Sequence, residues 1–289
     1  MNAERLEPKP IEVAGRLRGE TLGEGQPIAL LHGITATRRQ VVHGSNALAR
    51  EGMRMIQYDA RGHGESEPAP DDTGYGSPQN IADLRLVVEE QIGGRQFVLA
   101  GHSMGSHTAI GYALQDPDQI AGLVVIGPAY GGSIADPEQR QRVLARWDEL
   151  ADGLEQGGVD GFLEVMDRQG LDPAWRDTIL RFTRERMETH RHPEAVAQAM
   201  RELPRSKHFE LDELKSLDLP ALVVASHDVA DPGHPYALAE AYAARLPRSR
   251  LISEEEGESP LAWQGGRLSR EIAAFCAEPA VADRLKATA

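Results

Sequence analysis

The hydrophobic pattern alternates between short apolar runs and stretches in which apolar residues recur at helical spacing. The short runs are bounded by turn residues, as expected for strands buried on both faces of a parallel sheet. They occupy residues 27–32, 53–59, 97–100, 122–126, 221–225 and 250–253. Helical spacing is clear between them, with one apolar face at Ile81, Leu84, Val87, Val88 and Ile92. The alternation predicts an α/β protein with a mostly parallel, doubly wound sheet.

Two stretches depart from this alternation. Residues 11–17 alternate in part and predict an edge strand, followed by a glycine-rich turn over residues 19–25. Residues 131–216 are charged and helical in pattern throughout, with no strand-like run. We interpret them as a cap of short helices inserted between two strands, rather than a separate helical domain, because the β/α alternation resumes at once. The predicted division is a core at residues 11–130 and 217–276, a helical cap at 131–216, and flexible termini at 1–10 and 277–289.

The composition limits the partners and the compartment. Lysine and arginine number 31 against 45 aspartates and glutamates, so the net charge is −14, which disfavours nucleic acid and anionic membranes as partners. No apolar run approaches the ~20 residues of a membrane span, and the first residues lack the apolar segment of a signal peptide. The single cysteine, Cys276, fits a reducing compartment. We expect a cytoplasmic protein; no pattern indicates its oligomeric state.

The run at residues 97–100 leads into Gly101-His102-Ser103-Met104-Gly105, which matches the pattern Gly-x-Ser-x-Gly. In a nucleophile elbow a strand turns abruptly into a helix, and the two glycines remove side chains that would clash. The hydroxyl of Ser103 would then stand exposed at the carboxyl end of the sheet. The backbone N–H of Met104, at the start of the next helix, would lie beside it.

Two further motifs follow the two strands before this one. His32-Gly33 ends the run at residues 27–32, and Arg61-Gly62-His63-Gly64-Glu65-Ser66 follows the next. Together with the elbow they resemble the α/β-hydrolase fold family, and in particular its capped esterases and lactonases. The resemblance spans about residues 11–276 and is weakest in the cap.

The resemblance implies roles for residues in all three motifs. Ser103 falls on the family's nucleophile, and the N–H groups of Ile34 and Met104 on its oxyanion hole. His32, Gly33 and His102 fall on positions that shape the site. The resemblance implies no cofactor. Four other histidines have no partners at metal-ligand spacing, namely His43, His190, His192 and His208. We expect these four to face solvent and expect no metal site.

The acid and the base of the implied triad are less regular. The family's acid follows the strand after the cap, where Asp228 is favoured by its place just past the strand end, and Asp231 is the rival. The family's histidine follows the last strand, but here Glu258 occupies that position and no histidine follows His234. A carboxylate is a weak base unless its surroundings raise its pKa. We therefore expect Glu258 to lie in a sheltered site beside Asp228 or Asp231, with the pKa of one of the two carboxyls raised. The alternatives are a solvated loop acid at 258 or substitution by His227 or His234.

Two functions follow from these residues. The first is hydrolysis of a small ester, lactone or thioester through Ser103, with a triad that departs from the usual one. The second is a non-hydrolytic relative that binds a small molecule, or a lyase or cyclase in which a carboxylate is the base. The fold alone is compatible with both functions. The elbow serine favours the first function, and the missing histidine favours the second.

Overall fold

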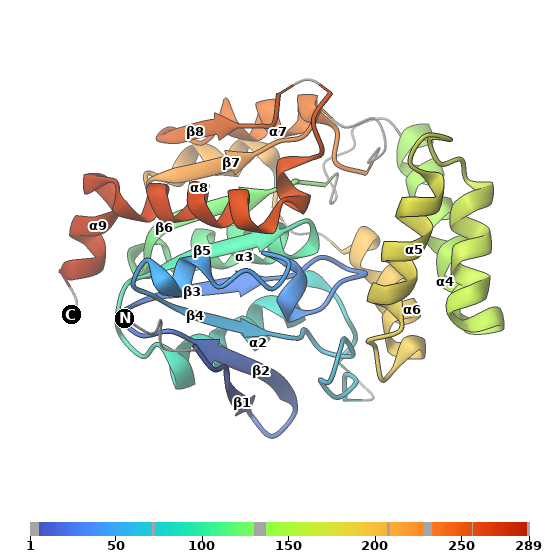
Figure 1. Cartoon of the computed structure of the whole chain (residues 1–289), viewed down its shortest axis with the longest axis horizontal. Coiled ribbons are helices and arrows are strands. Elements are labelled where there is room, and N and C mark those ends of the chain that lie inside the picture. The colour runs from blue at the N-terminus through green and yellow to red at the C-terminus, as the bar shows by residue number, and fades with distance from the viewer. Residues whose placement is uncertain are drawn as a thin grey trace.

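The computed structural model describes residues 6–70, 73–129, 137–206, 209–227, 233–255 and 257–287. Its strands are β1 (Lys9–Val13), β2 (Leu17–Leu22), β3 (Gln26–Leu31), β4 (Met53–Tyr58), β5 (Phe97–His102), β6 (Ile120–Ile126), β7 (Ala221–Val224) and β8 (Ser249–Ile252). They form one sheet in the order β1-β2-β4-β3-β5-β6-β7-β8 (Figure 1). The β1–β2 and β2–β4 pairs are antiparallel, and the other neighbouring pairs are parallel.

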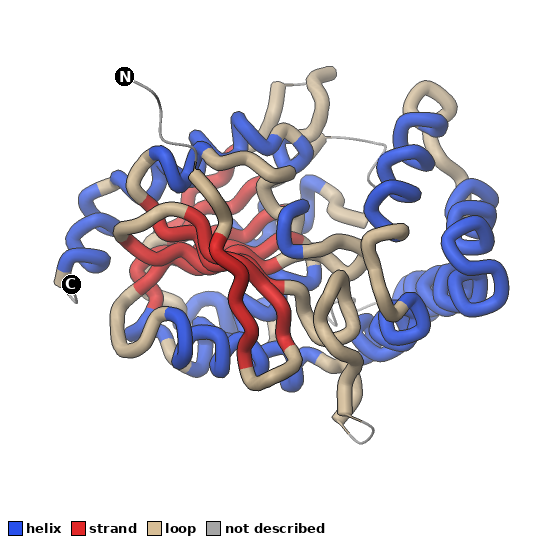
Figure 2. The backbone as a smooth tube through the Cα atoms, turned by 60° about the horizontal axis from the view of Figure 1, so that its bottom comes forward, coloured by secondary structure: helices blue, strands red, loops and turns tan. Residues whose placement is uncertain are grey.

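Helices cover both faces of the sheet, as Figure 2 shows. One face packs against α2 (Ser77–Gln91), α3 (Met104–Gln115) and α7 (Tyr236–Ala243), and the other against α1 (Ala47–Arg50), α8 (Gly265–Ala277) and α9 (Pro279–Lys286). Successive side chains of a strand point to opposite faces. In β3, Ala29 and Leu31 accordingly join the first apolar cluster and Ile28 and Leu30 the second. The predicted doubly wound, mostly parallel sheet is confirmed.

The first hairpin differs from the expected edge strand and turn. The chain reverses at Ala14 and Gly15, which have φ of 50° and 70°, so the residues expected as one strand contain the turn between β1 and β2. Gly19, expected in a turn, lies inside β2, where a Cβ would stand 2.6 Å from the carbonyl oxygen of Gln57. Its absent side chain lets β2 approach β4, and this close approach explains the glycine.

The predicted flexible carboxyl terminus is wrong for residues 279–286, which form α9. Val281 and Leu285 lie four residues apart on one face of this helix and are 0% and 3% exposed. Arg284 also donates a hydrogen bond of 3.0 Å to the carbonyl oxygen of Ile120 at the start of β6. Two buried apolar residues and one arginine therefore dock the segment on the sheet. At the other end, β1 already begins at Lys9, inside the predicted flexible residues 1–10.

The described part of the region between β6 and β7 is helical. It contains α4 (Pro137–Arg168), α5 (Arg176–Met187) and α6 (Pro193–Glu202), which lie together beside one end of the sheet (Figure 1). Helix α4 is a hairpin: its backbone leaves helical geometry at Gly158, with φ 60° and ψ −149°. A Cβ on Gly153 would stand 2.7 Å from the carbonyl oxygen of Gly161, so the two arms touch through their backbones. The division into a core and a cap at residue 131 stays a prediction.

The large apolar residues of these helices face in different directions. Phe162 is buried, whereas Trp175 and Phe182 are 47% and 55% exposed. The buried residues form an apolar cluster that also contains Ile34 and Met104, so the helices pack against the two residues predicted to supply the oxyanion donors. Within the described residues, no helix combines the length and the apolar character needed to cross a bilayer.

Candidate active site

Ser103 lies between the last residue of β5 and the first residue of α3, as the motif predicts. Its φ of 52° and ψ of −114° are strained for a residue with a side chain. A Cβ on Gly101 would stand 2.1 Å from the carbonyl oxygen of Gly105, and a Cβ on Gly105 would stand 2.2 Å from that of Leu31. Both glycines of the motif are therefore required by close backbone contacts, not by flexibility.

Hydrogen bonds hold this strained turn in place. The N–H of Ser103 donates to the carbonyl oxygen of Ile126 at 3.0 Å, and the carbonyl oxygen of Ser103 accepts from the amides of Ser106 and His107 at 2.9 and 3.2 Å. The hydroxyl of Ser106 donates to the same oxygen at 2.6 Å. These bonds tie the elbow to the neighbouring strand and to the first turn of α3, and the Ser103 side chain is left half-buried.

The loop after β3 passes directly beside the elbow. A Cβ on Gly33 would stand 3.1 Å from Nδ1 of His102 and 3.4 Å from Cβ of Ser103. Only a residue without a side chain fits that gap comfortably. Ile34 and Met104 are each 8% exposed and share one apolar cluster. That their amides converge on one point beside the Ser103 hydroxyl stays a prediction.

Three buried histidines surround the loop after β3. Gly33, Ile34 and Thr35 present successive carbonyl oxygens, and each lies near a different imidazole nitrogen: His32 Nδ1 at 2.8 Å, His63 Nε2 at 2.9 Å and His190 Nε2 at 3.4 Å. The rings of His32 and His63 are 5.2 Å apart, and those of His63 and His190 are 5.5 Å apart. The three imidazoles therefore form a continuous chain along the loop.

The sequence prediction for His190 is wrong, because this residue is 8% exposed and does not face solvent. It lies between α5 and α6, 126 residues from its hydrogen-bond partner Gly64, so no local pattern could reveal the contact. Burial, followed by the nearby His63, lowers the pKa of His190 to about 3. Burial also lowers the pKa values of His63 and His32, the latter well below the ordinary value. Histidines with such pKa values are neutral at pH 7.

The loop after β4 is anchored by the buried carboxylate of Asp59. Asp59 pairs with Arg38 and accepts hydrogen bonds from the backbone N–H groups of Arg38 and Glu65 at 2.8 and 3.0 Å. A Cβ on Gly64 would stand 2.3 Å from its Oδ2, which explains this glycine of the motif. Burial raises the pKa of Asp59 although Arg38 opposes the shift. The motif thus folds around an ion pair beneath the histidines.

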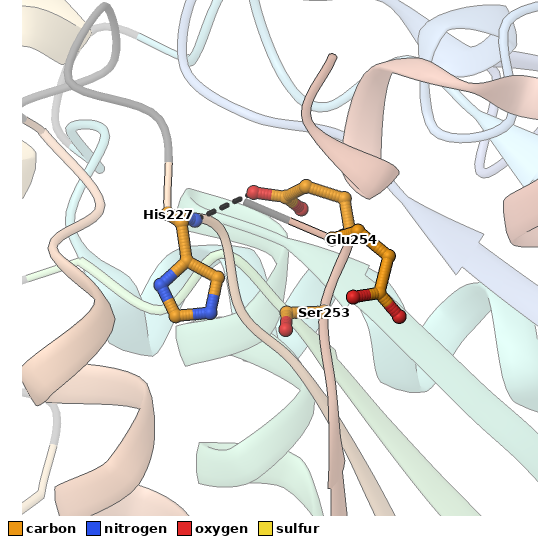
Figure 3. A pocket seen from close by; sticks show the side chains of 4 residues that line it. His227, Ser253 and Glu254 are labelled. Atoms are coloured by element: carbon orange, nitrogen blue, oxygen red, sulfur yellow. Dashed lines mark hydrogen bonds between the residues drawn. The ribbon is translucent and has the colours of Figure 1, made fainter. Parts of the chain in front are cut away.

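The predicted acids Asp228 and Asp231 lie outside the described residues. Just before them, a second buried carboxylate holds the chain. Glu254 is 3% exposed, and its Oε1 accepts hydrogen bonds from the Ser226 hydroxyl at 3.0 Å and the His227 amide at 2.5 Å (Figure 3). Its Oε2 accepts from the Leu261 amide at 2.9 Å. Glu254 therefore joins the loop after β7 to the loop after β8. The sequence analysis missed it, because it lies in an acidic run in which no position stands out.

Glu258 does not lie in the sheltered site that the sequence led us to expect. Its side chain is 47% exposed and pairs with Arg267 of α8 at 2.6 Å. The hydrogen bond from Arg267 lowers the pKa of Glu258 below its ordinary value, so Glu258 is not the carboxyl with a raised pKa. The physical reason is the arginine nine residues later, which places a cation beside the carboxylate.

The structure instead brings a histidine from the loop after β7 close to the elbow. The rings of His234 and His102 are 5.3 Å apart and tilted by 45°. A Cβ on Gly127 would stand 3.4 Å from Nε2 of His102 and 3.4 Å from Cγ of His234. His234 thus lies beside His102, the residue that precedes Ser103 in the chain.

His227 lies differently, although it belongs to the same loop. Its ring stacks on Tyr236, with centroids 3.9 Å apart. Together with Ser253, Glu254 and Glu255 it lines an open hollow of about 430 Å³ (Figure 3). Across the part of the chain that is described, no group of three or more histidine, cysteine or acidic residues is placed to hold a metal ion.

Comparisons with known proteins agree with this architecture. A family model described as "alpha/beta hydrolase fold" matches residues 26–259. The chain is 27% identical over 238 residues to the "Putative carbamate hydrolase RutD" of Agrobacterium fabrum, covering 81% of this chain and 86% of that protein. It is 37% identical over 100 residues to the sn-1-specific diacylglycerol lipase of Mus musculus, covering 34% of this chain but only 31% of the lipase.

A solved structure shares the fold over nearly the whole chain. The thermophilic esterase from Thermogutta terrifontis, with malate bound, superposes with a TM-score of 0.73 and 22% identity. The superposition covers 93% of this chain and 97% of the esterase. At this identity the likeness is one of fold.

Proposed function

Because the chain belongs to the α/β-hydrolase fold family, we propose that it hydrolyses a small ester, lactone or thioester through Ser103. The observation that carries the proposal is the backbone of Ser103, held at φ 52° between β5 and α3 with Gly33 against its side chain. A strained serine at the carboxyl edge of a sheet, with the loop after β3 packed beside it, suits attack on a carbonyl carbon. The hydrolase names of the relatives support the same reaction class.

The proposed reaction has two halves. The Ser103 oxygen bonds to the substrate carbonyl carbon while a base removes the hydroxyl proton, and the N–H groups of Ile34 and Met104 stabilise the negative charge on the carbonyl oxygen. The bond to the leaving oxygen or sulfur then breaks, and the leaving group receives the proton. Water repeats these steps on the acyl-enzyme and frees Ser103. Asp228 or Asp231 would orient the base.

For the base, the contacts favour His234 over Glu258. Imidazole has an ordinary pKa near 6.5 and accepts a serine proton well at neutral pH. The ring of His234 lies against that of His102, next to Ser103. Glu258 is paired with Arg267, and the pairing lowers the basicity of its carboxylate. We therefore propose that His234 takes the place of the histidine that the family carries after the last strand.

The test is hydrolysis of p-nitrophenyl acetate by single variants. Ser103→Ala should abolish turnover, and His234→Gln should lower kcat by about 10²- to 10⁴-fold, the usual contribution of a general base. His227→Gln is the matched control, because His227 comes from the same loop but stacks on Tyr236. Full activity in His234→Gln together with a large loss in Glu258→Gln would restore Glu258 as the base.

The second function keeps the fold without hydrolysis: a lyase or cyclase with a carboxylate base, or a small-molecule binding protein. The missing histidine favours it, because the position that the family gives to its histidine is held here by Glu258, which is paired with Arg267. A fluorophosphonate probe separates the two functions, since it labels an activated serine whatever the substrate. If Ser103 is neither labelled nor active toward any ester, lactone or thioester tested, the second function holds.

A further inference from the structure

We propose that His190 is a positioning residue through which the cap helices set the orientation of the oxyanion loop, by way of His63 and His32. Here the oxyanion loop means residues 32–35. The inference rests on the proposed function, because it concerns the amide of Ile34 as a donor to the reacting carbonyl oxygen. It gives the segment between α5 and α6, which is far from Ser103 in sequence, a part in orienting this donor.

The first step is that backbone contacts dictate the protonation of the two outer histidines. Nε2 of His32 accepts the amide hydrogen of Ala60 at 2.9 Å, so the proton of a neutral His32 lies on Nδ1 and is donated to the carbonyl oxygen of Gly33. Nδ1 of His190 likewise accepts the amide hydrogen of Gly64 at 2.9 Å. The proton of His190 therefore lies on Nε2 and points at the carbonyl oxygen of Thr35.

The central histidine has one proton for two acceptors. Nδ1 of His63 is 2.9 Å from the carbonyl oxygen of Arg61, and Nε2 is 2.9 Å from that of Ile34. A neutral imidazole donates only one hydrogen bond, so His63 holds the oxyanion loop only in the tautomer with the proton on Nε2. The ring of His190 lies edge-on against it, at 5.5 Å and 78°. His190 is thus placed to bias that choice.

The second step is that the carbonyl groups control the amide. In a trans peptide the carbonyl oxygen and the following N–H point in opposite directions. The carbonyl of Gly33 belongs to the same peptide group as the N–H of Ile34, and it accepts hydrogen bonds from His32 and from the Ala36 amide at 2.9 Å. These bonds fix the direction of the proposed oxyanion donor. The bonds from His63 and His190 hold the next two peptide groups.

The third step ties this loop to the cap. The N–H of Gly64 donates to His190, and the carbonyl oxygen of Gly64 accepts from the amide of Arg191 at 3.0 Å. The segment between α5 and α6 is therefore attached to the loop after β4 by a reciprocal pair of hydrogen bonds. His190 also reaches Thr35. It is in contact with both loops, so the seating of the cap and the direction of the Ile34 amide are mechanically coupled.

The test compares His190→Ala with His192→Ala. His192 is the matched control: it lies in the same segment, but its ring is 29% exposed and faces the carboxylates of Glu67 and Glu194. With p-nitrophenyl acetate, His190→Ala should lower kcat about 10- to 100-fold with KM changed less than twofold. Loss of a whole oxyanion donor costs about 10²–10³, and a misdirected one should cost less. His190→Gln, whose amide can accept from Gly64 and donate to Thr35, should recover most of the rate.

Inhibition by a transition-state analogue distinguishes a positioning role of His190 from a merely structural one. Phenylboronic acid forms a tetrahedral adduct with an active serine, so its inhibition constant should rise with the loss of kcat in His190→Ala and stay unchanged in His192→Ala. The inference is overturned if both variants behave alike, if the loss lies entirely in KM, or if His190→Gln is no better than His190→Ala in protein that is folded by circular dichroism.

A spectroscopic test works even if the proposed function fails. Long-range ¹H–¹⁵N spectra of the imidazoles should show the proton of His32 on Nδ1 and that of His190 on Nε2. His190→Ala should change the tautomer ratio of His63 and the amide shift of Ile34, whereas His192→Ala should change neither. Unchanged signals in His190→Ala would overturn the coupling, whether or not the protein hydrolyses esters.

Discussion

The elbow at Ser103 has two flanks that are built in different ways. The flank with the proposed oxyanion loop, called the oxyanion flank, consists of residues 32–35 and 61–66, and it contains buried histidines and ion pairs. The flank next to the proposed acids, called the acid flank, consists of residues 225–227, 233–235, 253–255 and 257–261. It is more open, with a hollow of about 430 Å³ beside it. On the acid flank, Glu254 is the buried carboxylate that bonds the described loops together.

This difference indicates which half of the site tolerates change. A flank held by several buried hydrogen bonds and ion pairs cannot shift without breaking several contacts at once. Where a buried carboxylate joins two loops, the surface residues beside it can change while that carboxylate stays. The departure from the family pattern, Glu258 in place of histidine, falls on the acid flank, where the side chain is solvated and paired with Arg267.

The largest expected effect is the loss of stability when a glycine of the elbow is replaced by alanine. The same replacement in the acid flank serves as the comparison. Gly105→Ala would put a Cβ 2.2 Å from the carbonyl oxygen of Leu31, and it should lower the free energy of unfolding by more than about 4 kcal/mol. Gly257→Ala, at φ 86° with nothing within 4 Å, should cost only about 1 kcal/mol. Urea unfolding measures both. Similar costs at the two positions would contradict the contrast between the closely packed elbow and the open acid flank.

The next effect is a loss of stability in acid, caused by His190, which contacts the oxyanion flank at Thr35 and Gly64. His190 has a pKa of about 3 in the folded protein against ~6.5 when unfolded. Above pH 6.5 both states are neutral at this residue, so the stability is fully present. As the pH falls toward 3, the unfolded chain binds a proton that the folded protein does not, and stability is lost. This loss should reach roughly 2–3 kcal/mol by pH 4.5.

The measurement for acid sensitivity is urea unfolding at pH 7 and pH 4.5 in the native protein and in His190→Gln. The variant has no titrating group at this position. Between pH 7 and pH 4.5 its free energy of unfolding should therefore fall by roughly 2–3 kcal/mol less than that of the native protein. His192→Gln is the control, because its ring is partly exposed. An equal fall in the native protein and His190→Gln would show that His190 is not buried as a neutral group.

A smaller effect is expected from the carboxylate that joins the acid flank. Glu254→Gln replaces one accepting oxygen with an NH₂ group that faces a donor, either at Ser226 and His227 or at Leu261. The free energy of unfolding should fall by about 1–3 kcal/mol. Glu255→Gln, at the exposed neighbour, should have no effect. Thermal unfolding of the two variants checks the prediction, and equal melting temperatures would refute it.

The smallest effect is expected at the position that departs from the family. Glu258→Gln removes a pair between two surface side chains, and such pairs contribute little to stability. Its melting temperature should match that of the native protein, and its kcat for p-nitrophenyl acetate should stay within about twofold if His234 is the base. A marked loss of activity without a loss of stability would place Glu258 in the catalytic machinery.

The sequence predicted features that depend on neighbouring residues. The elbow follows from two glycines within five residues, because each removes a clash with nearby backbone. The alternating sheet follows from periodicity along each strand. Helix α9 was missed because its docking face consists of only Val281 and Leu285, too few for a periodic signal.

The features that the sequence did not predict depend on distant partners. His190 meets Gly64 and Thr35, which lie 126 and 155 residues away, and nothing near His190 in the sequence indicates this. Glu258 fails as a sheltered base because Arg267 stands on the next helix. Burial and charge at a site are properties of the assembled fold, so residue type and position in a motif cannot supply them.

The hairpin of α4 has a practical consequence. Its turn at Gly157 and Gly158 has nothing within 4 Å of either missing side chain, while the arms behind it meet through Gly153 and Gly161. Extra residues placed in this turn would extend into solvent and leave the glycine contact intact. The turn is therefore a suitable insertion point for a fluorescent tag or a fused domain. A tag at this point, with a second label on the sheet, would report the distance between α4 and the sheet.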